Sequence, residues 1–245
     1  MKQALYEITS NRRIADSVYE IKLNGDLSEI RTPGQFVNLR IDGLYLRRPI
    51  SVCDVSGDCL TLIYKAVGKG TCMLSRMTVG QTVDVLSGLG NGYDLSVSGI
   101  WPLLIGGGAG VPPLFWLAKK LVEDGNTVTA VLGFNSAADV FYEEEFGNLG
   151  VETRITTVDG SYGIKGFVTD ALPEFYTHFY ACGPEPMLKA VYGKTFTSGQ
   201  FSFEERMGCG FGACMGCSCR TVTGFKRICK DGPVLKKEEI LWKQK

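Results

Sequence analysis

Hydrophobic and polar residues alternate in short runs through the first hundred residues of the chain. A period of two is typical of β-strands, because successive side chains of a strand point to opposite faces. Turn sequences such as Asn24-Gly25 and Asp42-Gly43 separate the runs, and strands at this spacing are typical of a barrel or a sandwich. We therefore predict an antiparallel β domain over residues 1–98, with a brief helix between Gly68 and Met77. The predicted strands include Tyr6–Thr9, Val18–Leu23, Phe36–Ile41, Leu60–Lys65 and Val83–Leu86.

The pattern changes at Trp101, where short apolar runs begin to alternate with amphipathic segments. The apolar runs predict strands, and the amphipathic segments between them predict helices. Strands that alternate with helices favour a parallel, doubly wound sheet, so we expect a Rossmann-like α/β domain over residues 99–200. The predicted strands are Trp101–Ile105, Val128–Gly133, Val151–Thr156 and His178–Ala181, and the predicted helices are Pro113–Glu123, Ala137–Phe146 and Met187–Val191.

Charge and hydropathy narrow the functional classes. Lys and Arg number 26 and Asp and Glu also number 26, so no net charge draws the protein to nucleic acid or to an anionic membrane. No apolar run approaches the roughly 20 residues of a membrane helix. The N-terminal residues alternate like a strand and lack the apolar block of a secretion signal. We expect a cytoplasmic protein with no nucleic-acid and no membrane partner.

The last segment, residues 201–245, is rich in glycine and cysteine and too irregular for a third hydrophobic core. Five of the nine cysteines of the chain lie in it. An odd number of cysteines without a secretion signal argues against a disulfide framework and favours metal binding. We therefore expect a small metal-binding lobe appended to the two domains.

Four cysteines of this segment have a spacing that indicates a [2Fe–2S] cluster. Cys209, Cys214, Cys217 and Cys229 follow the pattern C-x4-C-x2-C-x11-C, and its first three members match the plant-type cluster loop. Thiolates must converge on two irons from one tight loop, and the interspersed glycines let the backbone turn and bring N–H groups close to the sulfurs. These glycines are residues 208, 210, 212 and 216.

A structural zinc site is the alternative for these cysteines. Four thiolates suit tetrahedral zinc, but zinc sites of this kind usually present two CxxC pairs. The x4 and x2 spacing with intervening glycines favours the iron–sulfur cluster. Cys219 is surplus to the four ligands, and we expect it to be a bystander near the cluster.

A glycine-rich turn follows the first strand of the α/β domain. Such a turn between a strand and a helix can bind a phosphate through backbone N–H groups and the positive end of the helix dipole. The turn departs from G-x-G-x-x-G, and a tight βα connection without ligand is the alternative interpretation. The candidate phosphate-binding glycines are Gly106, Gly107, Gly108 and Gly110.

Two further features of the α/β domain bear on nucleotide binding. Cys182-Gly-Pro ends a later strand at the carboxyl edge of the sheet, where open α/β sheets bind ligands, so Cys182 is a candidate nicotinamide contact. A purely structural Gly-Pro stop of the strand is the alternative. No arginine pair follows the second strand: Gly133–Ser136 is neutral and Glu143–Glu145 are acidic. NAD is therefore favoured over NADP.

Short motifs in the β domain are suited to a flavin nucleotide. Arg48 and Ser51 lie close enough in sequence to hold a pyrophosphate, and Tyr64 on another strand can stack on a ring. The sequence Gly70-Thr71 begins the brief helix, where N–H groups can meet a second phosphate. Each of these elements taken alone is generic, and an Arg-Pro pair in a strand is often structural.

The order of these motifs resembles the ferredoxin reductase superfamily, and most closely the electron-transfer subunits of type B dihydroorotate dehydrogenases. R-P-x-S, a Y-K strand, G-x-G-T, GGGAG, CGP and E-x-R-M-x-C-G-x-G-x-C-x-x-C-x-C occur in that order, and Cys229 would be the distal ligand after a gap that is short for the family. The resemblance covers essentially the whole chain and implies an α+β multidomain fold. This fold consists of an FAD-binding barrel, a Rossmann-like NAD domain and a [2Fe–2S] lobe. The residues implied to contact FAD are Arg48, Pro49, Ile50, Ser51, Ile63, Tyr64, Lys65, Gly70 and Thr71.

The resemblance also implies a route for electrons and a partner. Electrons from FMN in a separate dihydroorotate-oxidising subunit would pass through the [2Fe–2S] cluster to FAD and leave on NAD⁺, in a hetero-oligomer with two copies of each subunit. His178, the one histidine, is expected to be a strand residue without a catalytic role. A small subunit of an NADH–ferredoxin–NADP oxidoreductase or of sulfide dehydrogenase is one alternative function. A zinc-stabilised interaction module without catalytic activity is an alternative of another class.

Overall fold

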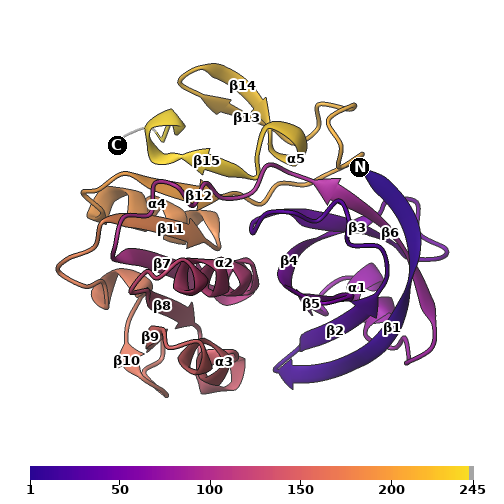
Figure 1. Ribbon diagram of the computed structural model, residues 1–245, viewed down its shortest axis with the longest axis horizontal. Helices are drawn as coiled ribbons and strands as arrows, with labels where there is room; N and C mark the ends of the chain where they lie inside the picture. Colours follow the sequence, from indigo (N-terminus) through magenta and orange to yellow (C-terminus); the bar gives the residue numbers. More distant parts are fainter. Residues whose placement is uncertain (243–245) are drawn as a thin grey trace.

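Six antiparallel strands close into a barrel in the computed structural model, which describes residues 1–242. The strands follow one another around the barrel in the order β1-β2-β5-β4-β3-β6, and β6 pairs with β1 (Figure 1). Alternate side chains such as Ile21, Leu39 and Leu62 fill the interior with no exposed surface. The barrel is therefore confirmed over the sandwich. The elements are β1 (Lys2–Ala15), β2 (Val18–Asn24), β3 (Phe36–Arg40), β4 (Arg48–Ser56), β5 (Cys59–Lys65), α1 (Lys69–Leu74) and β6 (Thr82–Leu89).

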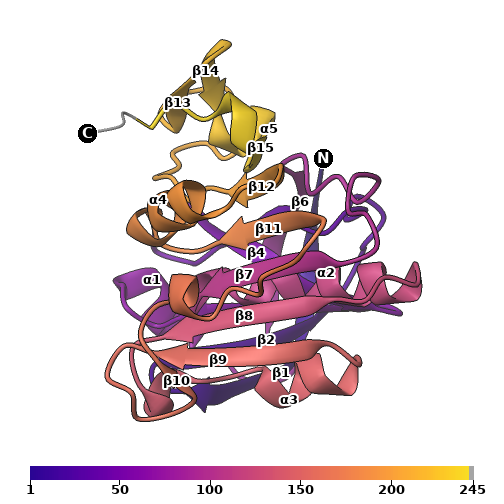
Figure 2. The same ribbon diagram turned by 90° about the vertical axis from the view of Figure 1, so that its left-hand side faces the viewer.

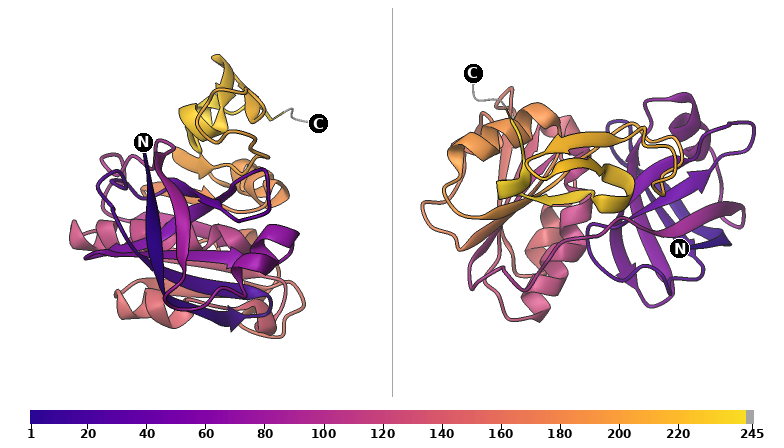
Figure 3. Two further views of the ribbon diagram at one scale, coloured as in Figure 1. Left: turned by 90° about the vertical axis from the view of Figure 1, so that its right-hand side faces the viewer. Right: turned by 90° about the horizontal axis from the view of Figure 1, so that it is seen from above.

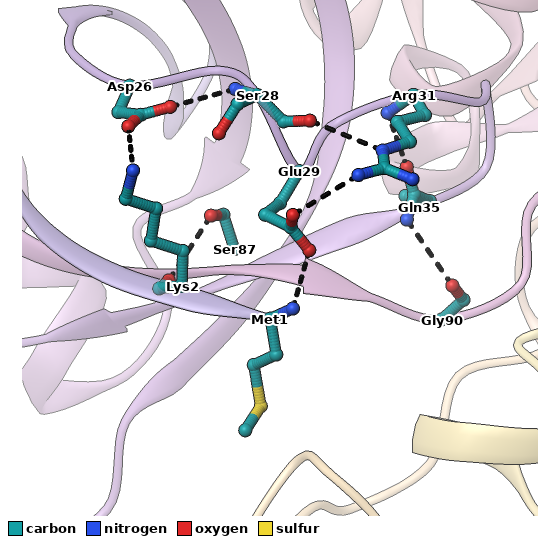
Figure 4. A network of polar contacts seen from close by, with 9 residues as sticks. All are labelled: Met1, Lys2, Asp26, Ser28, Glu29, Arg31, Gln35, Ser87 and Gly90. Carbon is teal, nitrogen blue, oxygen red and sulfur yellow. Dashed lines mark hydrogen bonds and ion pairs between the residues drawn. The ribbon is translucent and has the colours of Figure 1, made fainter.

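A network of polar contacts ties the start of β1 to the loop that leads into β3 (Figure 4). The N-terminal ammonium of Met1 lies 2.5 Å from Glu29 Oε2, and Lys2 pairs with Asp26. Further along the loop, Gln35 donates a hydrogen bond to the carbonyl oxygen of Gly90 at 3.4 Å. The network thus holds the entry to β3 against both β1 and the end of β6.

A seven-stranded sheet forms the second domain (Figure 2). Its strands lie in the order β10-β9-β8-β7-β11-β12-β15, where β15 is Val234–Lys236 of the C-terminal segment. All neighbouring pairs are parallel except β12 and β15. This arrangement confirms the expected Rossmann-like fold. No helix within residues 1–242 is both long enough and apolar enough to cross a bilayer. The elements are β7 (Pro102–Gly107), η1 (Gly108–Gly110), α2 (Pro112–Glu123), β8 (Thr129–Phe134), η2 (Ala137–Asp139), α3 (Glu143–Asn148), β9 (Glu152–Thr157), β10 (Ile164–Lys165), η3 (Val168–Asp170), β11 (His178–Cys182), α4 (Glu185–Lys194) and β12 (Gly199–Ser202).

The C-terminal lobe lies across the seam between the two domains (Figures 1 and 3). Its strand β15 pairs with β12, so the lobe completes the edge of the nucleotide-binding sheet. The predicted boundary at residue 201 falls within β12. A small apolar cluster in the lobe is shared with the barrel, which contributes Phe36 and Leu89. The lobe therefore has no core of its own and depends on both domains. Its elements are β13 (Ser218–Thr221), β14 (Gly224–Arg227), α5 (Ile228–Asp231), β15 (Val234–Lys236) and η4 (Lys237–Glu239).

The single helix predicted over 137–146 is wrong. The segment is a short 3₁₀ turn followed by α3, and Tyr142 at the start of α3 has a left-handed backbone conformation with φ 68°. A non-glycine residue rarely adopts this conformation, so the surrounding contacts must favour it. The side chain of Tyr142 is buried toward the barrel, and its hydroxyl donates a hydrogen bond of 2.9 Å to Glu20 Oε2.

The Tyr142 contact is the centre of a buried polar link between the domains. Glu20 on β2 is 3% exposed. Its other oxygen accepts a hydrogen bond from Arg12 Nε at 2.9 Å, so the carboxylate is paired on both sides. Burial raises the pKa of Tyr142, which keeps the phenol protonated as the donor. A second link between the domains is an ion pair, in which Lys119 Nζ on α2 lies 3.1 Å from Asp54 Oδ1 on β4.

Removal of the Tyr142 hydroxyl should destabilise the folded protein. Tyr142→Phe leaves a buried carboxylate one donor short, and we expect a loss of about 1–3 kcal/mol in the free energy of unfolding. Tyr162→Phe is the matched control, because Tyr162 donates a similar 2.7 Å bond to Glu143 at an exposed position. The control should change stability by less than about 0.5 kcal/mol. Thermal and urea unfolding followed by circular dichroism measures both variants, and equal losses would contradict the interdomain role.

Candidate functional site

A cavity of about 460 Å³ opens where the carboxyl ends of the parallel strands meet the barrel. The glycine turn at the end of β7, residues 133–135 at the end of β8 and Thr156 of β9 line it, together with the start of α4. Tyr64 and Lys65 of β5 line its barrel side. Ligands of open α/β sheets bind at this edge, so the cavity is a candidate nucleotide site.

The glycine-rich turn provides the backbone face of this cavity. Gly107 and Gly108 line it directly, whereas Gly106 and Gly110 are packed beneath. A Cβ at Gly110 would lie 2.2 Å from the carbonyl oxygen of Cys182, so only glycine fits there. The first two residues of α2, Pro112 and Pro113, have no N–H group. The donors for a phosphate must therefore come from the turn itself rather than from the first turn of the helix.

Cys182 ends β11 beside the glycine turn. It is 2% exposed, and burial raises its pKa to about 12, so its thiol is neutral. Such a thiol can pack against a ring but is not an activated nucleophile. His178 begins the same strand, and its Nε2 atom lies at hydrogen-bond distance, 3.3 Å, from Gln200 Nε2. This confirms the histidine as a buried strand residue.

The residues that would meet the adenosine ribose of a dinucleotide are neutral. Gly133, Phe134 and Asn135 line the cavity, as the neutral sequence after the second predicted strand suggested. Glu143 lies nearby in sequence and is hydrogen bonded to Tyr162. A 2′-phosphate requires a cation that these residues do not provide, which supports NAD over NADP.

A second candidate site is formed by Arg48 and the start of α1. A Cβ at Gly70 would lie 2.4 Å from Arg48 Nε, so the guanidinium rests directly on this glycine. The hydroxyl of Thr71 accepts the N–H groups of Val67 and Gly68, both at 3.2 Å, and shapes the turn that precedes the helix. A guanidinium beside a glycine-rich helix start can hold a diphosphate, so these predicted residues do come together.

Strand β4 presents the other predicted flavin residues in two directions. Arg48, Pro49, Ile50 and Ser51 are all half-buried, as expected for the wall of a crevice. Ile50, however, packs on the barrel core, so its side chain points away from the outer face. Pro49 and Ser51 alternate with it and therefore lie on the outer face of the barrel.

The three residues of β5 that are predicted to contact FAD lie in different surroundings. Tyr64 is stacked on Tyr19 with ring centroids 5.8 Å apart, and its hydroxyl donates to Asn11, so one ring face is already covered. Lys65 forms an ion pair with the α/β domain, in which its Nζ lies 3.6 Å from Asp139 Oδ1. Ile63 lines the cavity between the domains. The predicted FAD contacts of these residues stay predictions.

The first two cysteines of the lobe form an outer pair. Cys209 Sγ accepts hydrogen bonds from the N–H groups of Ala213 at 3.3 Å and Cys214 at 3.4 Å. Burial raises the pKa of Cys209, but the N–H groups of Phe211 and Cys214 and the Cys214 thiol together lower it to about 6. Cys214 itself is exposed. The loop therefore stabilises a thiolate, as metal binding requires.

Cys217 and Cys229 form an inner pair, each 2% exposed. The N–H group of Cys229 donates to Cys217 Sγ at 3.4 Å. Burial and the neighbouring thiol of Cys217 raise the pKa of Cys229 to about 12. Both side chains pack with Phe36 of the barrel, so this pair lies between the lobe and the barrel.

The two pairs fit the requirements of a [2Fe–2S] cluster. Each iron of such a cluster takes two thiolates, and the hydrogen bonds of the lobe group the cysteines as Cys209 with Cys214 and Cys217 with Cys229. Within residues 1–242, the structure brings no three His, Cys, Asp or Glu side chains together as a metal-ion site, so it joins the four cysteines as two pairs and not as one group. Cys219 packs against the small core beside the cysteines, and burial raises its pKa, as suits a bystander.

Two residues near these sites carry no sequence signal. Asn38 on β3 is 1% exposed, touches the cysteine loop, and has an Oδ1 atom with no partner in the described structure. Thr156 lines the cavity, and its buried hydroxyl likewise lacks a partner among the described residues. Only strand register and the docking of the lobe bring these side chains to the sites.

Similarities to known proteins agree with this arrangement. Residues 204–241 match the family described as the iron–sulfur cluster binding domain of dihydroorotate dehydrogenase B, and residues 104–192 match the oxidoreductase NAD-binding domain. The chain is 48% identical over 257 residues to the "Dihydroorotate dehydrogenase B (NAD(+)), electron transfer subunit" of Geobacillus sp. (strain WCH70), covering 98% of this chain and 99% of the relative. The protein of the same description from Bacillus pumilus (strain SAFR-032) is also 48% identical, with 98% of each chain covered.

Solved structures give the same result for the fold. A chain described under the NADH-dependent reduced ferredoxin-NADP oxidoreductase has a TM-score of 0.88 and 33% identity, and the match covers 98% of this chain and 90% of that chain. The cytochrome P450 reductase GcoB of Amycolatopsis has a TM-score of 0.68 and 24% identity over 77% of this chain and 64% of that chain, which supports the fold alone.

Substitution at Gly70 should weaken retention of the flavin nucleotide. The Cβ of Gly70→Ala would displace the guanidinium of Arg48 from the helix start, and losing a charge-assisted hydrogen bond costs about 1.5–3 kcal/mol, or at least about tenfold in the dissociation constant of FAD. Gly68→Ala is the matched control, because nothing lies within 4 Å of its Cβ position. Fluorescence titration of the stripped protein with FAD measures both variants. Equal affinities in the two variants would show that Arg48 does not hold the phosphates.

Proposed function

The chain belongs to the family of dihydroorotate dehydrogenase B electron transfer subunits, and we propose that it carries electrons from a dihydroorotate-oxidising partner to NAD⁺. The single observation that carries the proposal is the pairing of the four lobe cysteines beside the barrel. This pairing supports a [2Fe–2S] cluster that lies against the domain expected to bind FAD. The NAD site at the sheet edge completes the sequence of three centres.

The chemistry of the centres explains why all three are needed. FAD exchanges two electrons with a nicotinamide and single electrons with an iron–sulfur cluster, so it links carriers that cannot react with each other directly. The protein supplies placement: Arg48 and the start of α1 would hold the phosphates of FAD, and the turn at Gly107 and Gly108 would hold those of NAD. Cys182 does not line the cavity itself but lies beside Gly110 of the glycine turn, from where its neutral thiol would approach a bound nicotinamide. The route needs no acid–base side chain.

The position of the outer cysteine pair supports electron entry from the partner. Cys214 is exposed, and Phe211 and Met215 beside it are 44% and 53% exposed, so the lobe presents apolar surface around the cluster. Exposed apolar surface of this kind is typical of a docking face. The proposed occupant is an FMN-containing dihydroorotate dehydrogenase subunit, in an assembly with two copies of each chain.

A second candidate is the corresponding subunit of an NADH-dependent reduced ferredoxin-NADP oxidoreductase. The 33% identity and TM-score of 0.88 to such a chain favour it as the alternative. The two functions share the cluster, the flavin and the nucleotide site and differ in the partner. Purification of the chain from its own cells with identification of the companion subunit separates them.

Loss of the cluster should abolish the partner-linked reaction but spare the flavin. In the assembled complex, Cys214→Ser should prevent dihydroorotate-driven NAD⁺ reduction, because it removes one of the four thiolates on which the cluster depends. Oxidation of NADH by an artificial acceptor at the flavin should persist. Cys219→Ser is the matched control and should retain both activities. Equal loss of both activities in Cys214→Ser, with FAD still bound, would contradict this order of carriers.

A further inference from the structure

The outer faces of β3 and β4 bring the lobe and the flavin-binding strand together. On β3, Val37 and Leu39 point into the barrel core, so Phe36 and Asn38 point outward. Antiparallel pairing places Asn38 opposite Pro49 and Phe36 opposite Ser51. Side chains at opposed positions share one face, so these four side chains form one surface. Pro49 and Ser51 belong to the proposed FAD site, whereas Phe36 packs with the inner cysteine pair.

Asn38 is covered by the cysteine loop itself. Its Nδ2 lies 3.5 Å from the carbonyl oxygen of Cys209, at the long end of the range for a hydrogen bond. A Cβ at Gly210 would lie 1.9 Å from the same nitrogen, so the loop backbone is packed directly on the amide. Gly210 has a φ of +78°, which also requires glycine. The side chain of Asn38 therefore fills the space between the loop and Pro49.

The hydrogen-bonding state of Asn38 is unusual for a core position. The side chain is 1% exposed, and Oδ1 has no hydrogen-bond partner within residues 1–242. A buried acceptor without a donor destabilises the folded protein, and a leucine of similar shape would avoid that cost. The backbone oxygen of Asn38 is bound by Arg47 Nη1 at 3.2 Å, so the strand at this point is held in place. Packing alone does not account for an amide here.

We propose that Asn38 is the positioning residue that sets the cluster loop against the flavin-binding strand and thereby fixes the distance between the two electron carriers. The inference rests on the proposed function and adds a residue to it. The amide holds the Cys209–Gly210 backbone on one side and lies beside Pro49 on the other. Single-electron transfer slows steeply with distance, so a small outward shift of the loop reduces its rate. None of the residues that line the nucleotide cavity lies on β3, so hydride transfer between a nicotinamide bound there and the flavin would not be affected.

The experiment compares the two electron steps in the same holoprotein. Asn38→Leu keeps the approximate volume but removes both amide groups, and Asn38→Asp keeps the shape but removes the donor. Ser87→Ala is the matched control, because Ser87 is a buried side chain on the neighbouring strand β6 whose hydroxyl hydrogen bonds to the backbone of Lys2 and not to the cysteine loop. Stopped-flow mixing with NADH follows flavin reduction and cluster reduction separately. Electron paramagnetic resonance records the signal and the midpoint potential of the cluster.

We expect flavin reduction at the wild-type rate in all three variants. Cluster reduction should slow by about tenfold or more in both Asn38 variants, as for a misplaced reacting group, with a changed cluster signal. It should be unchanged in Ser87→Ala. If a variant does not retain its cluster while Ser87→Ala does, the loop-holding role is supported, and the other variant gives the rate. Wild-type cluster reduction rates and signals in cluster-loaded Asn38→Leu and Asn38→Asp would overturn the proposal. A wild-type protein whose cluster is never reduced by NADH would instead refute the proposed function.

Discussion

The lobe that carries the cysteines cannot form a core without the two domains beneath it. Its apolar cluster is completed by Phe36 and Leu89 of the barrel, and its strand β15 is completed by β12 of the sheet. Because the inner cysteines Cys217 and Cys229 belong to this same cluster, the position of their sulfurs is set by the barrel. The geometry of the metal centre therefore depends on how the lobe packs on β3.

The packing of the lobe also places the cluster, flavin and nucleotide sites along the boundary between the two domains. The outer face of β3 and β4 holds the lobe on one strand and the proposed flavin contacts on the next, and the cavity at the sheet edge is bounded on its barrel side by β5. The buried bond between Tyr142 and Glu20 and the ion pair between Lys119 and Asp54 tie the α/β domain to the barrel. Three ligand sites thus have fixed relative positions without any of them lying deep inside one domain.

Features that depend on neighbouring residues in the chain could be predicted from the sequence. The C-x4-C-x2-C spacing and its glycines describe one loop, and the alternating runs describe single strands, so both were confirmed as local structure. The assignment of Arg48 and Gly70 to one site required the family resemblance, since β5 separates them in the chain. Asn38 gave no signal, because only the β3–β4 register and the docking of the lobe give its amide a role. The break at Tyr142 was missed for the same reason: its left-handed conformation is favoured by Glu20, which lies 122 residues away in sequence.

The central claim is that four thiolates in two pairs hold two irons beside the barrel. Its most direct measurement is the iron, zinc and acid-labile sulfide content of the anaerobically purified chain, with low-temperature electron paramagnetic resonance after reduction by dithionite. The account predicts about two irons and two sulfides per chain and the signal of a reduced [2Fe–2S] cluster. One zinc per chain, no sulfide and no signal after anaerobic reconstitution would contradict it.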